Sequence, residues 1–163
     1  VLSTVEEYLG GKEDAAGYSI LSNVVCLSQV KDYYAVKLPG KIYLVGDCSG
    51  WNEPSKANAD KYVGWTLSEA DDAIDSKIYT GVFDIPAGKF QFRFYRSLSG
   101  WDVDSIGAQV DDDPVNIEWI DGVGYNGAVV EGKGSFQYSS WAGGKIKITV
   151  NLKAMTVEMV PAE

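Results

Sequence analysis

Residues 89–95 constrain the fold more than any other part of the sequence, because their side chains alternate strictly in character. The segment reads KFQFRFY, which places three phenylalanines on one face of an extended strand and Gln91, Arg93 and Tyr95 on the other. We expect the phenylalanine face to be buried in a core. Arg93 is then expected to point outward, away from that core.

Further strands are predicted where β-branched and aromatic residues cluster between glycine, aspartate, asparagine and proline. The last two such segments are separated by a turn at residues 151–154, which predicts a terminal hairpin. No convincing long amphipathic helix is present, which disfavours parallel sheets with helical crossovers. The pattern predicts an all-β fold, an immunoglobulin-like β-sandwich, with strands at residues 41–45, 77–85, 89–95, 114–119, 144–150 and 156–160.

Residues 1–38 differ from the rest, with a break at Gly10 and Gly11 and less regular apolar runs. We expect an N-terminal segment at residues 1–38, made of a linker and the first one or two strands, followed by the sandwich at residues 39–163. The chain begins VLSTVEEY without an initiator methionine, so we expect a mature protein or a piece of a longer one. Membrane attachment is expected only through a lipid anchor lost with the removed part.

Composition excludes several classes of function. The 14 lysines and arginines are outnumbered by 23 aspartates and glutamates, a formal net charge of -9, so no nucleic-acid partner is expected. Histidine is absent, which excludes Ser-His-Asp and Cys-His catalytic arrangements. Cys26 and Cys48 lack the spacing of a metal or redox motif, and one disulfide or two buried thiols both fit. The acidic runs 102–104 and 111–113 lack calcium-loop spacing, so no metal and no cofactor is expected.

Several tryptophans lie beside glycine, aspartate, asparagine or serine, the residues typical of loops. Trp51 lies in GDCSGWN and Trp101 in SLSGWDVD. An exposed indole can stack on the apolar C–H face of a sugar ring, while side chains such as Arg93 and Asn116 donate to hydroxyls. The alternative is that these indoles pack beneath their own loops and Arg93 is an ordinary solvated residue.

The succession IYLVGDCSGWN, FQFRFY, SGWD and VNIEW resembles starch- and glycogen-binding modules such as that of the AMP-activated kinase beta subunit. The resemblance implies a stacking platform made by Trp51 and Trp101. It also implies that Arg93 fills a basic position and that Asn116 reaches a sugar hydroxyl.

Residues 41–160 also resemble the SusE/SusF family of outer-membrane starch-binding lipoproteins of Bacteroidota, through FRFYRSLSGWD, GAQVDDD, GKGSF and WAGGKIKITVNLKAMTVEMV. This resemblance implies a carbohydrate-binding domain exposed at the cell outer membrane, within a glycan-uptake system and beside a transporter partner. It favours an α-glucan as the oligo- or polysaccharide ligand, without catalysis. GKGSF and WAGG add Lys133 and Trp141 to the expected ligand-binding residues.

Two other functions fit the same sequence. A structural spacer or adhesion domain without a ligand site would bury the tryptophans against a neighbour. A glycoside hydrolase needs only two carboxylates at a suitable separation. The hydrolase is disfavoured because the acidic residues lie mostly in turn clusters rather than in strand interiors.

Overall fold

The computed structural model describes residues 37–110 and 113–163. Residues Pro39–Glu163 form one compact unit, which is the part described below. The prediction for residues 1–38 falls almost wholly on residues outside the described part, as does Cys26. Cys48 is a free thiol.

Within the described residues the chain forms an 11-stranded sheet in which the pairs are antiparallel except for β6 and β9. The strand order is β6-β9-β4-β1-β2-β3-β10-β11-β7, with β5 paired to β4 and β8 paired to β5. The all-β prediction is confirmed. The strands are β1 (Lys41–Gly46), β2 (Thr66–Ser68), β3 (Ile78–Ile85), β4 (Gly88–Tyr95), β5 (Ser105–Gly107), β6 (Val115–Asn116), β7 (Tyr125–Ala128), β8 (Val130–Glu131), β9 (Phe136–Trp141), β10 (Gly144–Asn151) and β11 (Thr156–Pro161), with two 3-10 helices, η3 (Asp47–Ser49) and η4 (Lys56–Tyr62).

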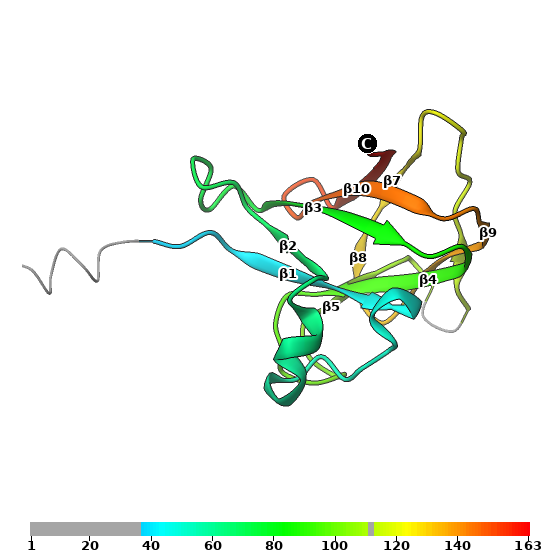
Figure 1. Ribbon diagram of the computed structural model, residues 1–163. Coiled ribbons are helices and arrows are strands. Elements are labelled where there is room, and N and C mark those ends of the chain that lie inside the picture. Colours follow the sequence, from blue (N-terminus) through cyan, green and yellow to red (C-terminus); the bar gives the residue numbers. More distant parts are fainter. Residues whose placement is uncertain (1–36, 111–112) are drawn as a thin grey trace, which may run out of the picture. The chain divides into compact units, whose positions relative to one another are not determined.

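The sheet is curled into two layers, with β1 and β4 in one and β3 and β10 in the other (Figure 1). The short strand β2 joins the layers, since it pairs with β1 along its length and with β3 at one position, Ser68 opposite Thr80. The main core lies between the layers. Its members include the three phenylalanines of β4 together with Ile146 and Ile148 of β10, each no more than 1% exposed. The predicted phenylalanine face is therefore buried, as expected.

The predicted strand boundaries hold where alternation is strong. The hairpin of β10 and β11 is confirmed, and its turn is fixed by Asn151, whose Oδ1 accepts hydrogen bonds from the main chains of Lys153 and Ala154, both at 3.0 Å. The segment predicted at residues 114–119 is wrong in extent, because only Val115–Asn116 forms a strand. β9 was not predicted, because the serines in FQYSSW hide the alternation of its aromatic residues.

The face of β4 opposite the phenylalanines is not open to water as expected, because loops cover much of it. Val45, Tyr62 and Tyr95 are fully buried there as a second, smaller core. The loop at 46–65 and the turn at 98–104 supply its cover, including the partly buried Trp51 and Trp101. This second core lies next to Arg93, and Trp51 and Trp101, which pack on the core, are thereby held beside Arg93.

Candidate functional site

Trp51 is held in place by the turn that ends β1. Its main-chain nitrogen donates to the carbonyl of Gly46 at 3.0 Å, and its φ of 49° lies in the left-handed region that bulky residues rarely adopt. Its indole Nε1 donates to Asp47 Oδ1 at 2.8 Å, while Asp47 Oδ2 accepts from the main chain of Gln91 at 3.0 Å. The indole plane is therefore fixed to both β1 and β4. Backbone strain of this kind occurs in turns and clusters at functional sites.

Trp101 comes from the turn that follows β4. Gly100, with a φ of 105°, donates from its main chain to the carbonyl of Pro54 at 2.9 Å, which ties this turn to the Trp51 loop. The Tyr95 hydroxyl donates to the carbonyl of Trp101 at 3.2 Å, and the two rings meet edge to face with centroids 5.9 Å apart. Burial raises the pKa of Tyr95, with Arg93 opposing the shift, so the phenol stays neutral.

Arg93 lies among these rings. Its guanidinium carbon is 5.7 Å from the centroid of Trp51, 5.4 Å from that of Tyr95 and 5.5 Å from that of Trp101. Each distance is within the range of a cation–π interaction. We call Trp51, Arg93, Tyr95 and Trp101 the arginine cluster. The structure thus brings together the two predicted stacking residues and the predicted basic residue.

The guanidinium is only partly supplied with hydrogen-bond acceptors. Its Nη1 donates to the carbonyl of Lys133 at 2.5 Å. Its Nε is shielded from solvent and has no acceptor among the described residues. A guanidinium carries five N–H donors, so donors other than the shielded Nε remain for a ligand beside the two partly exposed indoles.

Lys133, another predicted site residue, reaches the cluster through its main chain. Its side-chain Nζ instead pairs with Asp102 Oδ1, in the residue after Trp101. This hydrogen bond raises the pKa of Lys133 and lowers that of Asp102, and the charge attraction adds to both shifts. Both side chains are exposed. The pair closes the turn that carries Trp101.

Asn116 lies on the same side of the sheet but at a distance. It is exposed on β6 and accepts from Gln137 Nε2 of β9 at 3.2 Å. Gln137 lies opposite Gln91 of β4, so Asn116 is separated from β4 by two strand spacings, roughly 10 Å. These amides form a polar row that ends beside Arg93, in which Gln91 Nε2 donates to Ser135 Oγ at 2.9 Å.

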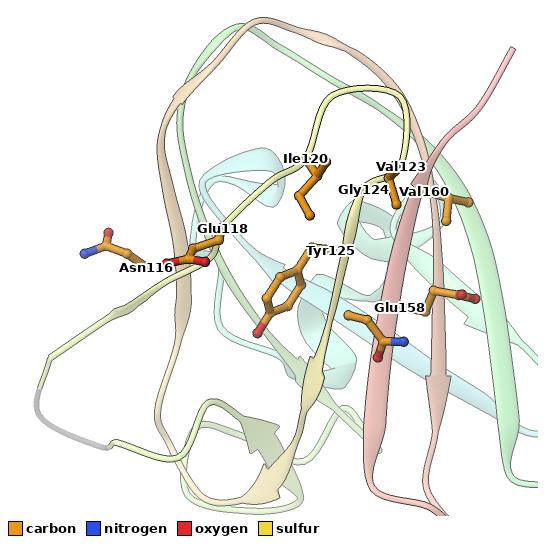
Figure 2. Close-up of a pocket in the computed structure, with 9 residues that line it drawn as sticks. Asn116, Glu118, Ile120, Val123, Gly124, Tyr125, Glu158 and Val160 are labelled. Carbon is orange, nitrogen blue, oxygen red and sulfur yellow. The ribbon is translucent and has the colours of Figure 1, made fainter.

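Asn116 also borders a pocket of about 530 Å³ between the end of β6 and β7, lined by Tyr125, Ile120 and Glu118 among others. Figure 2 shows the Asn116 amide pointing away from Tyr125. Its hydrogen bond to Gln137 directs the side chain toward the polar row. The pocket is therefore distinct from the arginine cluster.

The structure does not bring Trp141 to the other predicted residues. Trp141 lies opposite Gly88 at the start of β4, and Arg93 is five residues further along, about 16 Å at the rise of a strand. Its Nε1 donates to the carbonyl of Ile85 at 3.1 Å, and its ring packs against Trp119 with centroids 4.9 Å apart. Trp141 belongs to a second aromatic group, at another end of the sheet.

Tyr95 was not among the residues predicted to bind the ligand, although its alternation with Arg93 placed the two on one face.

Among the described residues no group of three or more potential ligands could hold a metal ion. In the same part of the chain, no helix has both the length and the apolar character needed to cross a bilayer.

Comparisons with known proteins give little further identification. No family model matches the chain, and no curated protein matches it. Among solved structures, SusF from Bacteroides thetaiotaomicron is similar with 18% sequence identity and a TM-score of 0.47. The match covers 72% of this chain and 23% of the SusF chain, so this chain spans about a quarter of the protein it matches.

Proposed function

We propose that residues 39–163 bind a polysaccharide, without catalysis, at the arginine cluster. The observation that carries the proposal is the packing of one guanidinium against Trp51, Tyr95 and Trp101, two of which are partly exposed indoles on adjacent loops. Indole faces remove the apolar C–H face of a sugar from water. A guanidinium beside them supplies donors for the hydroxyls.

The expected affinity is modest. Each stack contributes about 1 to 3 kcal/mol by analogy with bases on aromatic rings. Two stacks with a few hydrogen bonds correspond to a dissociation constant of roughly micromolar to millimolar. Such a site works best in multiple copies along a polymer.

The polar row extends the proposed site along the sheet. Gln91, Gln137 and Asn116 present amide groups on successive strands next to Arg93. Amides both donate to and accept from sugar hydroxyls. A chain of sugar units lying across β4, β9 and β6 would meet the indoles first and the amides next.

The proposal also names the polysaccharide and the place where the protein binds it. An α-glucan such as starch is the favoured ligand, since the sequence motifs resemble starch-binding modules. The same resemblance supports a place on the outer membrane surface, within a glycan-uptake system and beside a transporter. Linkage preference depends on the angle between the indole planes of Trp51 and Trp101.

Native gel electrophoresis with soluble starch or another polysaccharide in the gel tests the site. The protein should be retarded, and Trp51→Ala and Trp101→Ala should each lose most of the retardation. Trp65→Phe is the matched control, because Trp65 stacks on Phe83 at 5.7 Å, outside the arginine cluster. Retardation unchanged in Trp101→Ala would move the site elsewhere. Release of reducing sugar, abolished by one acidic substitution, would overturn the absence of catalysis.

A structural spacer is the second candidate. One observation favours it: both Trp51 and Trp101 also cover the small buried core of Val45, Tyr62 and Tyr95. In that case the arginine cluster would only fasten the two loops to the sheet. The spacer predicts that no polysaccharide retards the protein and that Trp101→Ala lowers stability alone.

A further inference from the structure

A second hollow lies at the end of the sheet where Trp141 packs. It has a volume of about 320 Å³ and is lined by Trp119, Tyr138 and Trp141 together with the turn between β9 and β10. We call these three residues the end cluster. The volume is near the lower limit for small-ligand sites, so it suits a short segment of a ligand.

The rings of the end cluster are held in fixed orientations. Trp141 is tied by its Nε1 to the carbonyl of Ile85 at 3.1 Å. Trp119 and Tyr138 meet it edge to face, with centroids 4.9 Å and 6.1 Å away. All three rings pack on the main core yet are partly exposed. A ring that is fixed by packing on one face and exposed to solvent on the other can stack on a ligand without rearrangement.

The polar groups at this hollow indicate an uncharged ligand. One carboxylate, from Asp121, and one ammonium, from Lys145, contribute opposite charges to the lining, and Ser140 adds a hydroxyl. All three residues are exposed. A phosphate or a polycation would meet an unfavourable charge in either case, whereas hydroxyl groups can pair with both signs.

Gly143, in the turn between β9 and β10, and Gly144, at the start of β10, line the hollow. Gly143 and Gly144 have φ values of 90° and 121°, which side-chain-bearing residues rarely adopt. A Cβ added at Gly144 would meet no heavy atom within 4 Å. The backbone is therefore accessible to a ligand beside the rings.

We propose that the end cluster is a second saccharide-binding site, separate from the arginine cluster and specific for a neutral sugar segment. The inference extends the proposed function to a module with two contact sites. It stands on different residues, about 16 Å along the sheet from Arg93. Two weak sites on one domain raise the apparent affinity for a long polymer well above that for a short oligosaccharide.

Titration of the full chain with maltoheptaose and with cellohexaose, followed by the indole N–H signals of the 15N-labelled protein, tests both sites at once. The chain has 5 tryptophans, and single Trp→Phe variants assign their signals. The signals of Trp119 and Trp141 should shift with a dissociation constant in the millimolar range, and that of Trp65 should stay fixed.

The outcomes separate the two proposals. Shifts of Trp119 and Trp141 without shifts of Trp51 and Trp101 sustain the end-cluster site and overturn the arginine-cluster site. The reverse pattern overturns the end-cluster site alone. If none of these signals shifts with either sugar at tens of millimolar, both sites are overturned.

Variants test the end cluster independently. Trp119→Ala should weaken binding there about tenfold or more, the loss of one stack. If Trp119→Ala folds poorly, Asp121→Ala tests the site instead, because Asp121 is exposed. This variant should weaken binding at the end cluster a fewfold. Ile120→Ala is the matched control, because Ile120 lies between them in sequence, is 60% exposed and lines the other pocket. Equal binding by Asp121→Ala and Ile120→Ala, with Trp119 signals unmoved, would overturn the inference.

Discussion

Glu69 and Arg93 are two charged side chains drawn away from water, and the protein compensates their charges in different ways. Glu69 is only 4% exposed. Its Oε2 accepts from the main chains of Gly40 at 2.9 Å and Asp75 at 3.1 Å, and its Oε1 accepts from that of Lys77 at 2.7 Å. The carboxylate fastens the loop before β3 to the start of β1.

The charge of Arg93 is stabilised mainly by the faces of aromatic rings. Three aromatic rings lie within cation–π distance, and one carbonyl, of Lys133, accepts from Nη1. Nε has no acceptor among the described residues. An unmet donor costs about 1 to 3 kcal/mol.

The difference separates a structural charge from a functional candidate. A buried carboxylate that already accepts three main-chain hydrogen bonds has little left for a ligand. A charge set beside two partly exposed indoles, with N–H donors in reserve, can recognise hydroxyl groups. Substitutions at Glu69 should therefore change stability alone, whereas those at Arg93 should change both stability and binding.

Glu69→Gln should give the largest loss of stability, because an amide replaces one acceptor oxygen by a donor group facing main-chain N–H groups. Urea denaturation should show a clear fall in midpoint, while retardation in polysaccharide gels stays that of the parent protein. Asp84→Asn, at an exposed strand position, is the control and should leave the midpoint unchanged. A loss of sugar binding in folded Glu69→Gln would break the distinction.

The contribution of Glu69 should depend on pH. Hydrogen bonds, first that from Gly40, lower its pKa in the folded protein below its ordinary value of 4.5. The unfolded chain therefore binds this proton first as pH falls. The stabilisation should be complete above pH 4.5 and lost progressively below it. Unfolding midpoints of parent and Glu69→Gln should converge in acid, and a constant difference from neutral to strongly acidic pH would contradict this.

Arg93→Ala should come next, lowering the free energy of unfolding by about 2 to 3 kcal/mol, because cation–π contacts and a charge-assisted hydrogen bond are lost. Polysaccharide retardation should vanish. Arg93→Lys keeps the charge without the planar fork and should recover less than half of each effect. Arg96→Ala is the control, since Arg96 makes exposed ion pairs with Glu131 and Asp104 that contribute little. Full binding by stable Arg93→Ala would remove Arg93 from the site.

The sequence could predict the sheet, the face that carries Arg93 and the loops that carry Trp51 and Trp101, because strand alternation and loop chemistry are local signals. The three phenylalanines of β4, with their period of two, placed Arg93 on the opposite face, and glycine-rich turns marked Trp51 and Trp101. That these three residues lie together was implied by the resemblance to starch- and glycogen-binding modules. It did not follow from any local rule, since Trp51 and Arg93 meet only through the pairing of β1 with β4.

The remaining features were hidden because they depend on tertiary packing. Tyr95 was expected to face outward with Arg93, but the loops at 46–65 and 98–104 bury it completely. Trp141 shares its loop-like neighbours with Trp51, yet it packs at a different end of the sheet. Neighbouring glycine and serine therefore mark a loop tryptophan without telling which surface it joins. Glu69 gave no signal, since its partners are main-chain groups.

Tyr62→Phe should have a smaller effect, about 1 kcal/mol of stability. Tyr62 is fully buried, and its hydroxyl donates to the carbonyl of Asn52, next to Trp51. Burial raises its pKa to about 12, so the phenol is a neutral donor at ordinary pH. Binding should weaken only a fewfold, because Trp51 keeps its bond to Asp47. Tyr43→Phe is the control, since Tyr43 is a partly buried residue that packs against the ring of Tyr62. Equal losses of binding in both variants would argue against a positioning role for the hydrogen bond from Tyr62 to Asn52.

Lys133→Ala should have the smallest effect of all, although Lys133 was a predicted binding residue. Its carbonyl, which accepts from Arg93, is unchanged by the substitution. Its ammonium pairs with Asp102 at an exposed position, where salt and water screen the charges. We therefore expect unchanged unfolding midpoints and polysaccharide retardation within twofold of the parent, with Asp102→Asn behaving alike. A loss of binding in Lys133→Ala as large as that in Arg93→Ala would show that a second cation contacts the sugar directly. In that case, packing of a charge against aromatic rings would not distinguish binding residues from exposed charges.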